Sequence, residues 1–281
     1  MEYLMTYGWA ILIIAVVLGA LFQLGVFNAG TFAPRAPPGA CQVFRPNGPM
    51  STSLINLEGV CSGELPQYVV NAGSGGEIST GQVVLPSNTF TVVFWTNWKG
   101  YTGNGYNNFV QQTDGASDGS GFLIDACGAA NNLRVDINQG SGNGRSEQAM
   151  CYGVSLNTWF YAAISSNGAT GVTTLYINGQ QINTINNADT PSGTFDICGG
   201  AYGPSTNGEM ANVQAYNTSL SAPEINALYL EGIGGAPIKL QNLIGWWPLN
   251  GNANDYSGNN NNGVPSSVTY TNQWTSGYTP P

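Results

Sequence analysis

Few residues in this 281-residue chain could do acid–base, nucleophilic or metal chemistry. The chain contains no histidine, which excludes Ser-His-Asp and Cys-His catalysis and the common zinc hydrolase motifs. Glycoside hydrolysis needs only two carboxylates about 5 to 10 Å apart, and Asp125 and Asp136 fall on neighbouring expected strands. A clustered E-x-D-x-E pattern is absent from the sequence, however. The sequence therefore predicts that the protein is not an enzyme.

Loops rich in side-chain oxygen atoms are the candidates for a cofactor site. Ca²⁺ takes about six to eight oxygen ligands from carboxylates, amides and carbonyls. Asn254, Asp255 and Asn259 supply such oxygens in one loop, and Asp114 and Asp118 supply them in another. The competing interpretation is that Asn and Gly serve turns with positive φ. Calcium is the one cofactor that the sequence suggests, with Asp255 as the leading ligand.

Aromatic residues in loops suggest a surface that binds carbohydrate. The chain has 7 Trp and 14 Tyr, and most of the tryptophans lie in strand patterns that belong in a core. Tyr101, Tyr106 and Tyr202 lie in expected loops and are the candidate ligand-binding residues. Asn217 opens an Asn-Thr-Ser glycosylation sequon. In that competing interpretation the surface carries sugar rather than binding it.

Charge limits the class of partner. Charged residues make up 7% of the chain, against about 25% in typical domains. The six Lys and Arg residues are scattered and the net charge is −9, so the chain has no basic patch that could hold phosphates. Nucleic acid is therefore not an expected partner, and the neutral polar composition is typical of a secreted protein.

The five cysteines favour disulfides over metal binding. They form no C-x-x-C pair and have no histidine to complete a zinc site, whereas an oxidising compartment favours disulfides. Cys41 and Cys61 flank a loop with Pro and Gly and form the expected pair. Among Cys127, Cys151 and Cys198 one is left over, and the sequence does not choose which.

The elements that position these residues begin with an apolar segment, Met1–Phe27. After Glu2 the next charged residue is Arg35, and a helix over Leu4–Phe27 would be about 36 Å long, enough to cross a hydrocarbon core of about 30 Å. A cleaved secretory signal and a plain membrane anchor are the alternatives, although a signal requires a basic n-region. We expect a transmembrane or filament-core helix whose partners are lipid and other copies of the chain.

The run EYLMTYGWAILII, residues 2–14, resembles the N-terminal helix of archaeal type IV pilin-like proteins. In that family a glutamate near the mature N-terminus neutralises the terminal ammonium of a neighbouring subunit, and Glu2 is the matching residue. A carboxylate beside a membrane-spanning run is costly unless it is paired or reaches the interface. The resemblance implies an assembly role for Glu2, and the alternative places Glu2 among lipid headgroups.

Downstream of this helix the sequence predicts a Pro/Gly stalk over 28–66 and then a mainly β domain. Short β-rich runs recur between Gly, Asn and Ser turns, a spacing typical of an antiparallel sandwich. Asn178-Gly179 predicts a two-residue hairpin turn, and the capping box that begins at Ser221 predicts a helix that ends at Gly232. The expected strands are Gln67–Asn71, Gly81–Leu85, Thr89–Trp95, Asn108–Gln112, Gly121–Asp125, Leu133–Ile137, Trp159–Ile164, Thr173–Ile177, Thr194–Cys198 and Met210–Tyr216.

Residues 67–232 resemble the laminin-G-like jelly roll of the concanavalin A-like superfamily. The resemblance rests on the runs FTVVFW at 90–95, NTWFYA at 157–162, TLYING at 174–179 and MANVQAYN at 210–217. A run at 243–259 resembles the opening strand and loop of the same family, so 233–281 is expected to complete the sandwich in a permuted order, a truncated second repeat being the alternative.

Together the two resemblances imply a surface subunit of a type IV pilin-like filament with an outward lectin-like adhesion domain. Such a chain would lie in the cell membrane as a single-pass protein before assembly and at the extracellular surface afterwards. A membrane-tethered module that binds carbohydrate or protein without polymerising is the alternative. A glycan or a surface protein is the expected external partner.

Overall fold

The computed structural model describes residues 13–17, 41–44, 56–59, 65–73, 75–101, 107–113, 120–126, 131–138, 148–200 and 206–281. The contacts divide the chain into two units, Met1–Pro37 and Pro38–Pro281. In the first unit Ile13–Val17 is helical and its large apolar side chains are exposed. Within the described ranges no helix combines the length and the apolar character needed to span a bilayer. Glu2 and most of the expected N-terminal helix lie outside these ranges.

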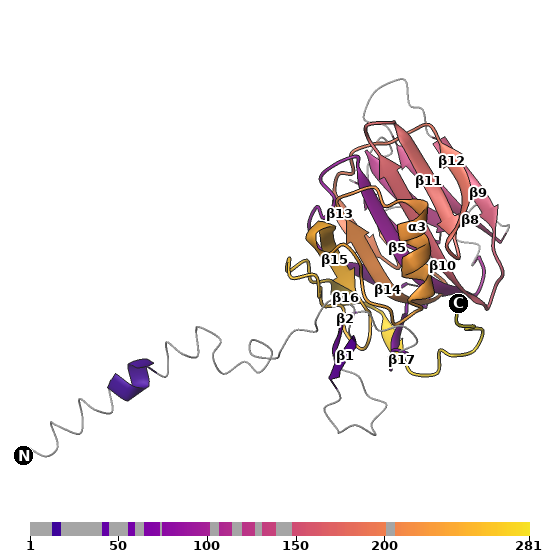
Figure 1. Cartoon of the computed structure of the whole chain (residues 1–281). Helices are drawn as coiled ribbons and strands as arrows, with labels where there is room; N and C mark the ends of the chain where they lie inside the picture. The colour runs from indigo at the N-terminus through magenta and orange to yellow at the C-terminus, as the bar shows by residue number, and fades with distance from the viewer. Residues whose placement is uncertain are drawn as a thin grey trace, which may run out of the picture. The chain divides into compact units, whose positions relative to one another are not determined.

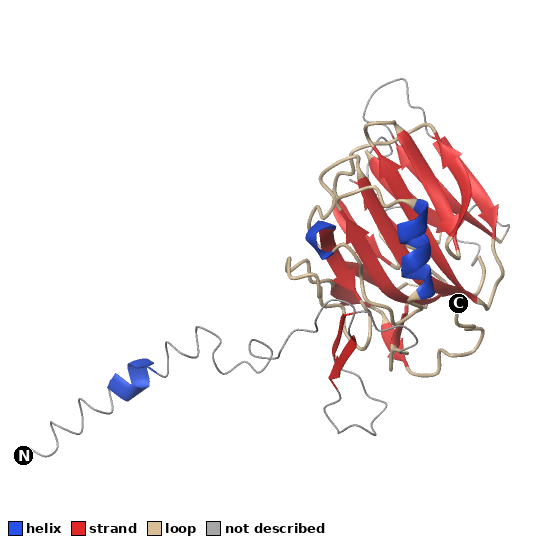
Figure 2. Ribbon diagram, in the orientation of Figure 1, coloured by secondary structure: helices blue, strands red, loops and turns tan. Residues whose placement is uncertain are grey.

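Two antiparallel sheets, here called sheet 1 and sheet 2, are stacked in the second unit (Figures 1 and 2). Sheet 1 contains, in order, β12 (Gln180–Ile185), β11 (Val172–Ile177), β10 (Trp159–Asn167), β5 (Phe90–Trp98), β14 (Gly208–Tyr216), β3 (Val69–Asn71) and β17 (Thr269–Thr271), with β15 (Leu243–Trp247) paired to β14. Sheet 2 contains β16 (Val264–Ser266), β4 (Glu77–Ser79), β13 (Thr194–Ile197), β6 (Val110–Thr113), β7 (Gly121–Ala126), β8 (Asn132–Asn138) and β9 (Gln148–Gly153). This arrangement confirms the expected jelly-roll sandwich.

A separate two-stranded ribbon lies in the segment expected to be a stalk. Its strands are β1 (Cys41–Phe44) and β2 (Asn56–Gly59), with Cys41 opposite Gly59. Residues 41–44 and 56–59 of the segment 28–66 are therefore β-structure. The expected pairing of Cys41 with Cys61 lies outside the described side chains.

Strand β5 has a buried side chain at every position because both of its faces are covered. Phe90, Val92 and Phe94 belong to the core between the sheets, as their alternation predicts. Val93 and Trp95 face the other way and belong to a second apolar cluster. The helix α3 (Ala222–Leu230) crosses this outer face of sheet 1 and contributes to the second cluster (Figure 2).

The capping box that the sequence predicts starts α3. The backbone N–H and the hydroxyl of Ser221 each donate to Glu224 Oε2 over 2.8 Å. A hydrogen bond and ion pair from the Lys239 ammonium lowers the pKa of Glu224 to about 2. After the helix, Gly232 adopts a φ of +79°, a left-handed conformation that favours glycine. The helix is followed by a short 3₁₀ turn, η1 (Leu240–Asn242).

The hairpin between β11 and β12 is the one that the sequence predicts. Asn178 and Gly179 have φ values of 48° and 74°, as a two-residue type I′ turn requires. The Asn178 side chain adds to this turn, because its Oδ1 accepts the backbone N–H of Tyr161 over 2.9 Å. The turn is therefore fastened to the neighbouring strand β10.

The strand expected over Gly81–Leu85 is wrong. The Gln112 side chain occupies the place of a partner strand: its Oε1 accepts the backbone N–H groups of Val84 and Leu85, and its Nε2 donates to the carbonyl of Leu85. A single side-chain amide thus satisfies backbone groups that a sheet ladder would otherwise satisfy. The apolar run is real, but Val84 and Leu85 are buried without forming a strand.

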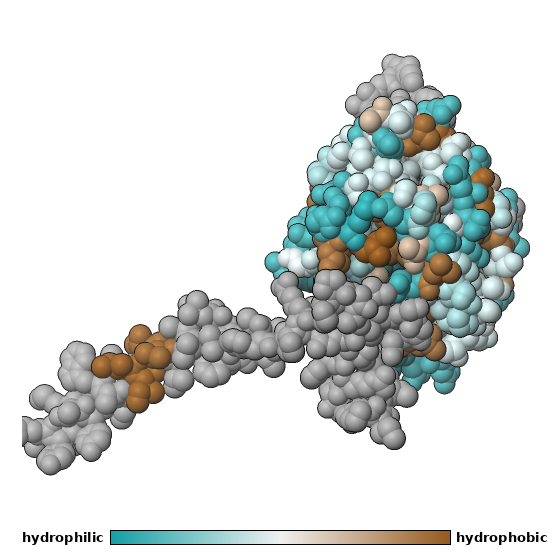
Figure 3. Space-filling view, in the orientation of Figure 1, coloured by the Kyte–Doolittle hydropathy of each residue, from teal (hydrophilic) through white to brown (hydrophobic). Residues whose placement is uncertain are grey.

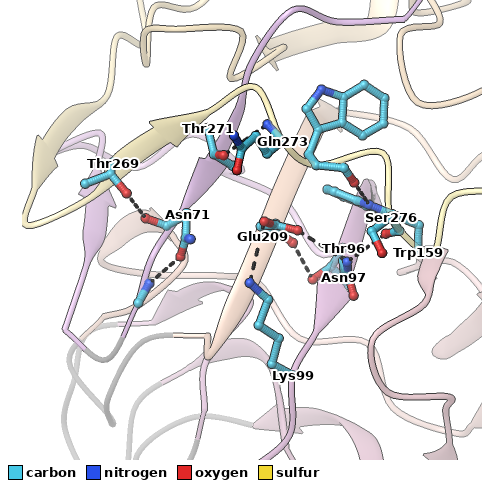
Figure 4. A network of polar contacts seen from close by, with 12 residues as sticks. Asn71, Thr96, Asn97, Lys99, Trp159, Glu209, Thr269, Thr271, Gln273 and Ser276 are labelled. Atoms are coloured by element: carbon cyan, nitrogen blue, oxygen red, sulfur yellow. Dashed lines mark hydrogen bonds and ion pairs between the residues drawn. The ribbon is translucent and has the colours of Figure 1, made fainter.

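The C-terminal segment contributes strands to both sheets. β15 and β17 pair with β14 and β3 in sheet 1, and β16 pairs with β4 in sheet 2. Figure 4 shows a polar network at the end of sheet 1 that the segment joins. In it Asn97 Nδ2 donates both to Glu209 Oε2 and to the backbone oxygen of Ser276, and Lys99 Nζ lies 3.5 Å from Glu209 Oε1.

Trp274 fastens this segment to sheet 1. Its side chain is 2% exposed, its indole N–H donates to the carbonyl of Pro66, and its own carbonyl accepts the indole N–H of Trp159 over 2.8 Å. The Trp274 and Trp159 rings meet edge to face, with centroids 5.8 Å apart.

We expect Trp274→Ala to lower the free energy of unfolding by about 3–5 kcal/mol, because it opens a cavity in the second apolar cluster. Denaturation in urea, followed by circular dichroism, measures this loss. The matched control is Gln273→Ala, since Gln273 is exposed and its loss should change stability by no more than about 0.5 kcal/mol. Equal stability of the two variants would contradict a structural role for the segment.

Candidate ligand-binding face

The outer face of sheet 2 carries polar and charged side chains where the inner face carries the core. Along β13, Phe195 and Ile197 belong to the core between the sheets, so Thr194 and Asp196 lie on the outer face. The strand register places Ser79 and Gln111 on either side of Asp196. We call this outer surface of sheet 2 the polar face, and its members are Glu77, Ser79, Asn108, Gln111, Thr113, Asp125, Arg134, Asp136, Thr194 and Asp196.

Asp196 is the centre of one hydrogen-bond network on the polar face. Its carboxylate accepts hydrogen bonds from Ser79 Oγ at 2.6 Å, Gln111 Nε2 at 3.2 Å and Thr194 Oγ1 at 3.2 Å. The Asp196 residue is 2% exposed. Burial raises the pKa of the Asp196 carboxyl above its ordinary value of 3.8, and these three hydrogen bonds offset part of the rise.

Glu77 lies beside this network and is half-buried. Burial raises the pKa of Glu77 above its ordinary value of 4.5, and the negative charge of Asp196 adds to the rise. The two carboxyls therefore resist being charged at the same time. The polar face consequently has an affinity for protons that isolated surface carboxylates lack.

Arg134 organises a second network further along the polar face. Its Nε and Nη2 donate to the two carboxylate oxygens of Asp125 at 2.8 and 2.7 Å, a bidentate pair, and its Nη1 lies 3.7 Å from Asp136 Oδ2. Asp125 is fully buried and Asp136 is 4% exposed. The cross-strand register of β7 and β8 places Asp125 opposite Arg134, which confirms that the two candidate carboxylates lie on adjacent strands.

Within the part of the chain that the structure describes, two buried polar atoms near the Asp196 network lack a hydrogen-bond partner. They are Oδ1 of Asn108 and Oγ1 of Thr113. Asn108 Nδ2 donates to Gln111 Oε1 at 3.0 Å, which joins Asn108 to the network and leaves its Oδ1 spare. A buried unpaired polar atom costs about 1–3 kcal/mol, so such atoms call for a ligand or a water molecule.

The loop that holds Asp255 is organised by that residue. Asp255 Oδ1 accepts the backbone N–H groups of Trp246 and Ser257, and Oδ2 accepts the N–H of Asn261 and the hydroxyl of Ser257, all at 2.8–2.9 Å. These bonds occupy the carboxylate's lone-pair sites. The geometry therefore favours the turn interpretation of this loop over a calcium site.

The neighbours of Asp255 fit the same interpretation. Asn254 is exposed, and Asn259 Nδ2 donates to the carbonyl of Leu243 at 3.1 Å. The described part of the chain contains no group of three or more His, Cys, Asp or Glu side chains that could hold a metal ion. Asp114 and Asp118 lie outside it.

Of the three tyrosines expected to bind ligand, the structure describes one, Tyr101. Tyr101 is half-buried and packs against the core between the sheets, so it is not an open platform. Tyr106 and Tyr202 lie outside the described residues. Asn217 of the sequon is exposed, and its Oδ1 accepts a hydrogen bond from Asn242 at 3.1 Å; its glycosylation stays a prediction.

Cys151 and Cys198 differ in state. Cys151 in β9 is disulfide-bonded, whereas Cys198 is a free, fully buried thiol. Burial raises the pKa of the Cys198 thiol far above its usual range, so the group is a core residue rather than a nucleophile.

The family model described as the concanavalin A-like lectin/glucanases superfamily matches residues 72–226, and the chain belongs to this superfamily. No curated protein matches the chain.

Solved structures support the same fold. A candidate carbohydrate binding protein from Bacteroides ovatus is 16% identical, with a TM-score of 0.55 over 73% of this chain and 60% of its own length. The CBM40 of an IT-sialidase from Ruminococcus gnavus, bound to α2,3-sialyllactose, is 15% identical, with a TM-score of 0.46 over 59% of this chain and 98% of its own. A SAP-like pentraxin from Limulus polyphemus is 14% identical, with a TM-score of 0.43 over 58% of this chain and 82% of its own. At 16% identity the likeness to the Bacteroides ovatus protein shows the fold alone, and no argument rests on the other two structures.

The raised pKa values predict how stability depends on pH. The folded protein holds protons on Asp196 and Glu77 more tightly than the unfolded chain does. Their stabilising effect is complete below the unfolded values near 3.8 and 4.5 and is lost as the pH rises through the raised folded values. The contribution of these two groups to the free energy of unfolding should therefore rise as the pH falls from neutral towards 4.5.

Urea denaturation over this pH range measures the effect, and Asp196→Asn should flatten the curve because it removes the central titrating group. Glu224→Gln is the control. The pKa of Glu224 is about 2, so its stabilising effect is lost only below about pH 4.5. A curve for Asp196→Asn that parallels the unchanged protein would contradict the assignment.

Proposed function

We propose that the sandwich is a glycan-binding module and that the polar face is its binding surface. The observation that carries the proposal is the pair of buried, unpaired polar atoms on Asn108 and Thr113 beside the Asp196 network. A sugar hydroxyl both donates and accepts, so separate hydroxyl groups of one glycan would pair with the Asn108 carbonyl and with the Thr113 hydroxyl, which lie at opposite ends of β6. Membership of a superfamily of lectins and glucanases supports the choice of ligand class.

Binding is a better account of the polar face than hydrolysis. Asp125 is tied to Arg134 by two short hydrogen bonds, and such a pair holds a carboxylate ionised and fixed rather than ready to move a proton. Asp196 shares its carboxylate among three hydrogen-bond donors. These arrangements provide rigid acceptors and donors, which suit recognition of neutral hydroxyl groups.

The module is, in the same proposal, displayed at the cell surface by the N-terminal segment as a subunit of a type IV pilin-like filament. The support is the resemblance of residues 2–14 and the apolar character of the segment, which Figure 3 shows for Ile13–Val17. These side chains are 49–63% exposed in the single chain. Exposed apolar surface of this kind favours burial in lipid or against other copies.

The binding proposal is tested by Thr113→Val on a glycan array and by calorimetry with the best glycan found. The change removes the unpaired hydroxyl and keeps the shape of the side chain. We expect affinity to fall about fivefold to tenfold, the loss of one hydrogen bond. Stability should stay equal or rise, because a buried hydroxyl without a protein partner is removed.

Thr184→Val is the matched control, since Thr184 is exposed on β12 of sheet 1. It should leave glycan affinity unchanged. Equal affinity of the two variants would refute the polar face as the binding surface, and an array with no bound glycan would refute the ligand class.

Electron microscopy of sheared cell surfaces, with mass spectrometry of the N-terminus, tests the filament. If the protein is recovered only as a single-pass membrane chain, the filament proposal is refuted and the tethered, non-polymerising module remains as the alternative.

A further inference from the structure

The chain enters sheet 1 through β3, and this entry strand is hydrogen-bonded on both sides. It pairs with β14 on one side and with β17 of the C-terminal segment on the other, so that Val70 lies opposite both Met210 and Tyr270. Thr269 Oγ1 also donates to the carbonyl of Asn71 at 3.4 Å (Figure 4). Among the described strands of sheet 1, β3 would be an edge strand without β17. An edge strand is bonded on one side only, whereas a pull on β3 must break the ladders on both sides.

The chain just before β3 is held by side chains from the C-terminal segment. The N–H of Tyr68 donates to Asn250 Oδ1 at 2.8 Å. The carbonyl of Pro66 accepts the indole N–H of Trp274 at 3.2 Å. Leu65, one residue earlier, is 43% exposed. The part of the chain that these bonds fix to the sandwich therefore begins at Pro66.

Packing adds to the hydrogen bonds of β3. Successive residues of a strand point to opposite faces of the sheet, and both faces of β3 are covered. Val69 belongs to the second apolar cluster and Val70 belongs to the core between the sheets, and both are fully buried. Withdrawing β3 along its own direction therefore breaks two ladders and exposes both of these side chains at once.

Trp274 connects Pro66 to the centre of sheet 1. The carbonyl of Trp274 accepts the indole N–H of Trp159 at 2.8 Å, and the backbone N–H of Trp159 donates to the carbonyl of Gly277 at 3.0 Å. Trp159 is the first residue of β10, which lies between β11 and β5. A pull on Pro66 is thus passed through Trp274 to an interior strand of the sheet rather than to a loop.

We propose that residues 66–71, held by the C-terminal segment, form an anchor through which the sandwich bears mechanical tension from the N-terminal part of the chain. When a ligand holds the sandwich and a surface holds the N-terminal segment, the pull between them reaches the sandwich at Pro66. The anchor takes its purpose from the proposed surface display. Its strength requires neither a glycan nor a filament, so the two proposals can fail separately.

Single-molecule force spectroscopy of the full chain in detergent micelles tests the anchor. One handle is attached at the N-terminus and the other to Thr184→Cys, because Thr184 is exposed on β12. The diagnostic variant is Trp274→Phe, which keeps an aromatic ring and removes the indole N–H that holds Pro66. We expect its rate of rupture at constant force to rise about fivefold to tenfold, the effect of one lost hydrogen bond.

Trp247→Phe is the matched control. Trp247 is fully buried, and its indole N–H likewise donates to a backbone carbonyl, that of Asn261 at 2.9 Å. The change therefore removes the same atoms without removing a hydrogen bond to residues 66–71. Its rupture rate should stay within about twofold of the unchanged protein, because the bond that it lacks is not among those that release β3.

A second pair of handles, on Ser87→Cys and Thr184→Cys, leaves β3 outside the pulled stretch of chain. With these handles Trp274→Phe should rupture at an unchanged rate. Asn250→Ala removes the acceptor of the Tyr68 N–H and should speed rupture from the N-terminus as Trp274→Phe does, which keeps the test open if that variant fails to fold. Unchanged rupture of both variants would overturn the proposal. Equal acceleration by Trp247→Phe, or acceleration with the second handles, would show general weakening of the domain and would also overturn it.

Discussion

The burial of β5 on both of its faces is the constraint on which the rest of the domain depends. One face of a central strand always meets the opposing sheet in a sandwich, but the other face commonly meets water. Here Trp95 and Val93 on that second face are buried, and the cluster they join needs cover. The helix α3 and the segment around Trp274 provide it, through contacts that include the ring stacking of Trp95 on Tyr229.

Because α3 and the C-terminal segment cover sheet 1, the outer faces of the two sheets differ in the side chains that they carry. The outer face of sheet 1 is occupied by α3 and the C-terminal segment, and the surface around them is mostly hydrophilic, with scattered apolar patches (Figure 3). Among the described residues, the outer face of sheet 2 has no such apolar cluster. Its strands alternate core residues with the polar residues of the Asp196 and Arg134 networks, so it is the face that offers hydrogen bonds rather than packing.

Elements with strong local signals were predictable from the sequence. The β11–β12 turn follows from Asn178-Gly179, α3 follows from its capping box, and the burial of Trp247 follows from its place in a strand pattern. Prediction failed where distant side chains replaced local rules. The run around Val84 reads as a strand, yet Gln112 satisfies its backbone from β6. Short strands such as β4 are set by their partners, because three residues carry too little alternation to be recognised.

The residues of the polar face were not predicted as a group for the same reason. Ser79, Gln111 and Asp196 are far apart in the chain, and only the register of β4, β13 and β6 brings them together. The signal that could have found them is the alternation in β13, where Thr194 and Asp196 interleave with apolar residues. A buried polar stripe costs free energy unless its groups are paired. The unpaired atoms of Asn108 and Thr113 are such a cost, and they are the reason that the proposed binding surface is the polar face rather than the loop tyrosines.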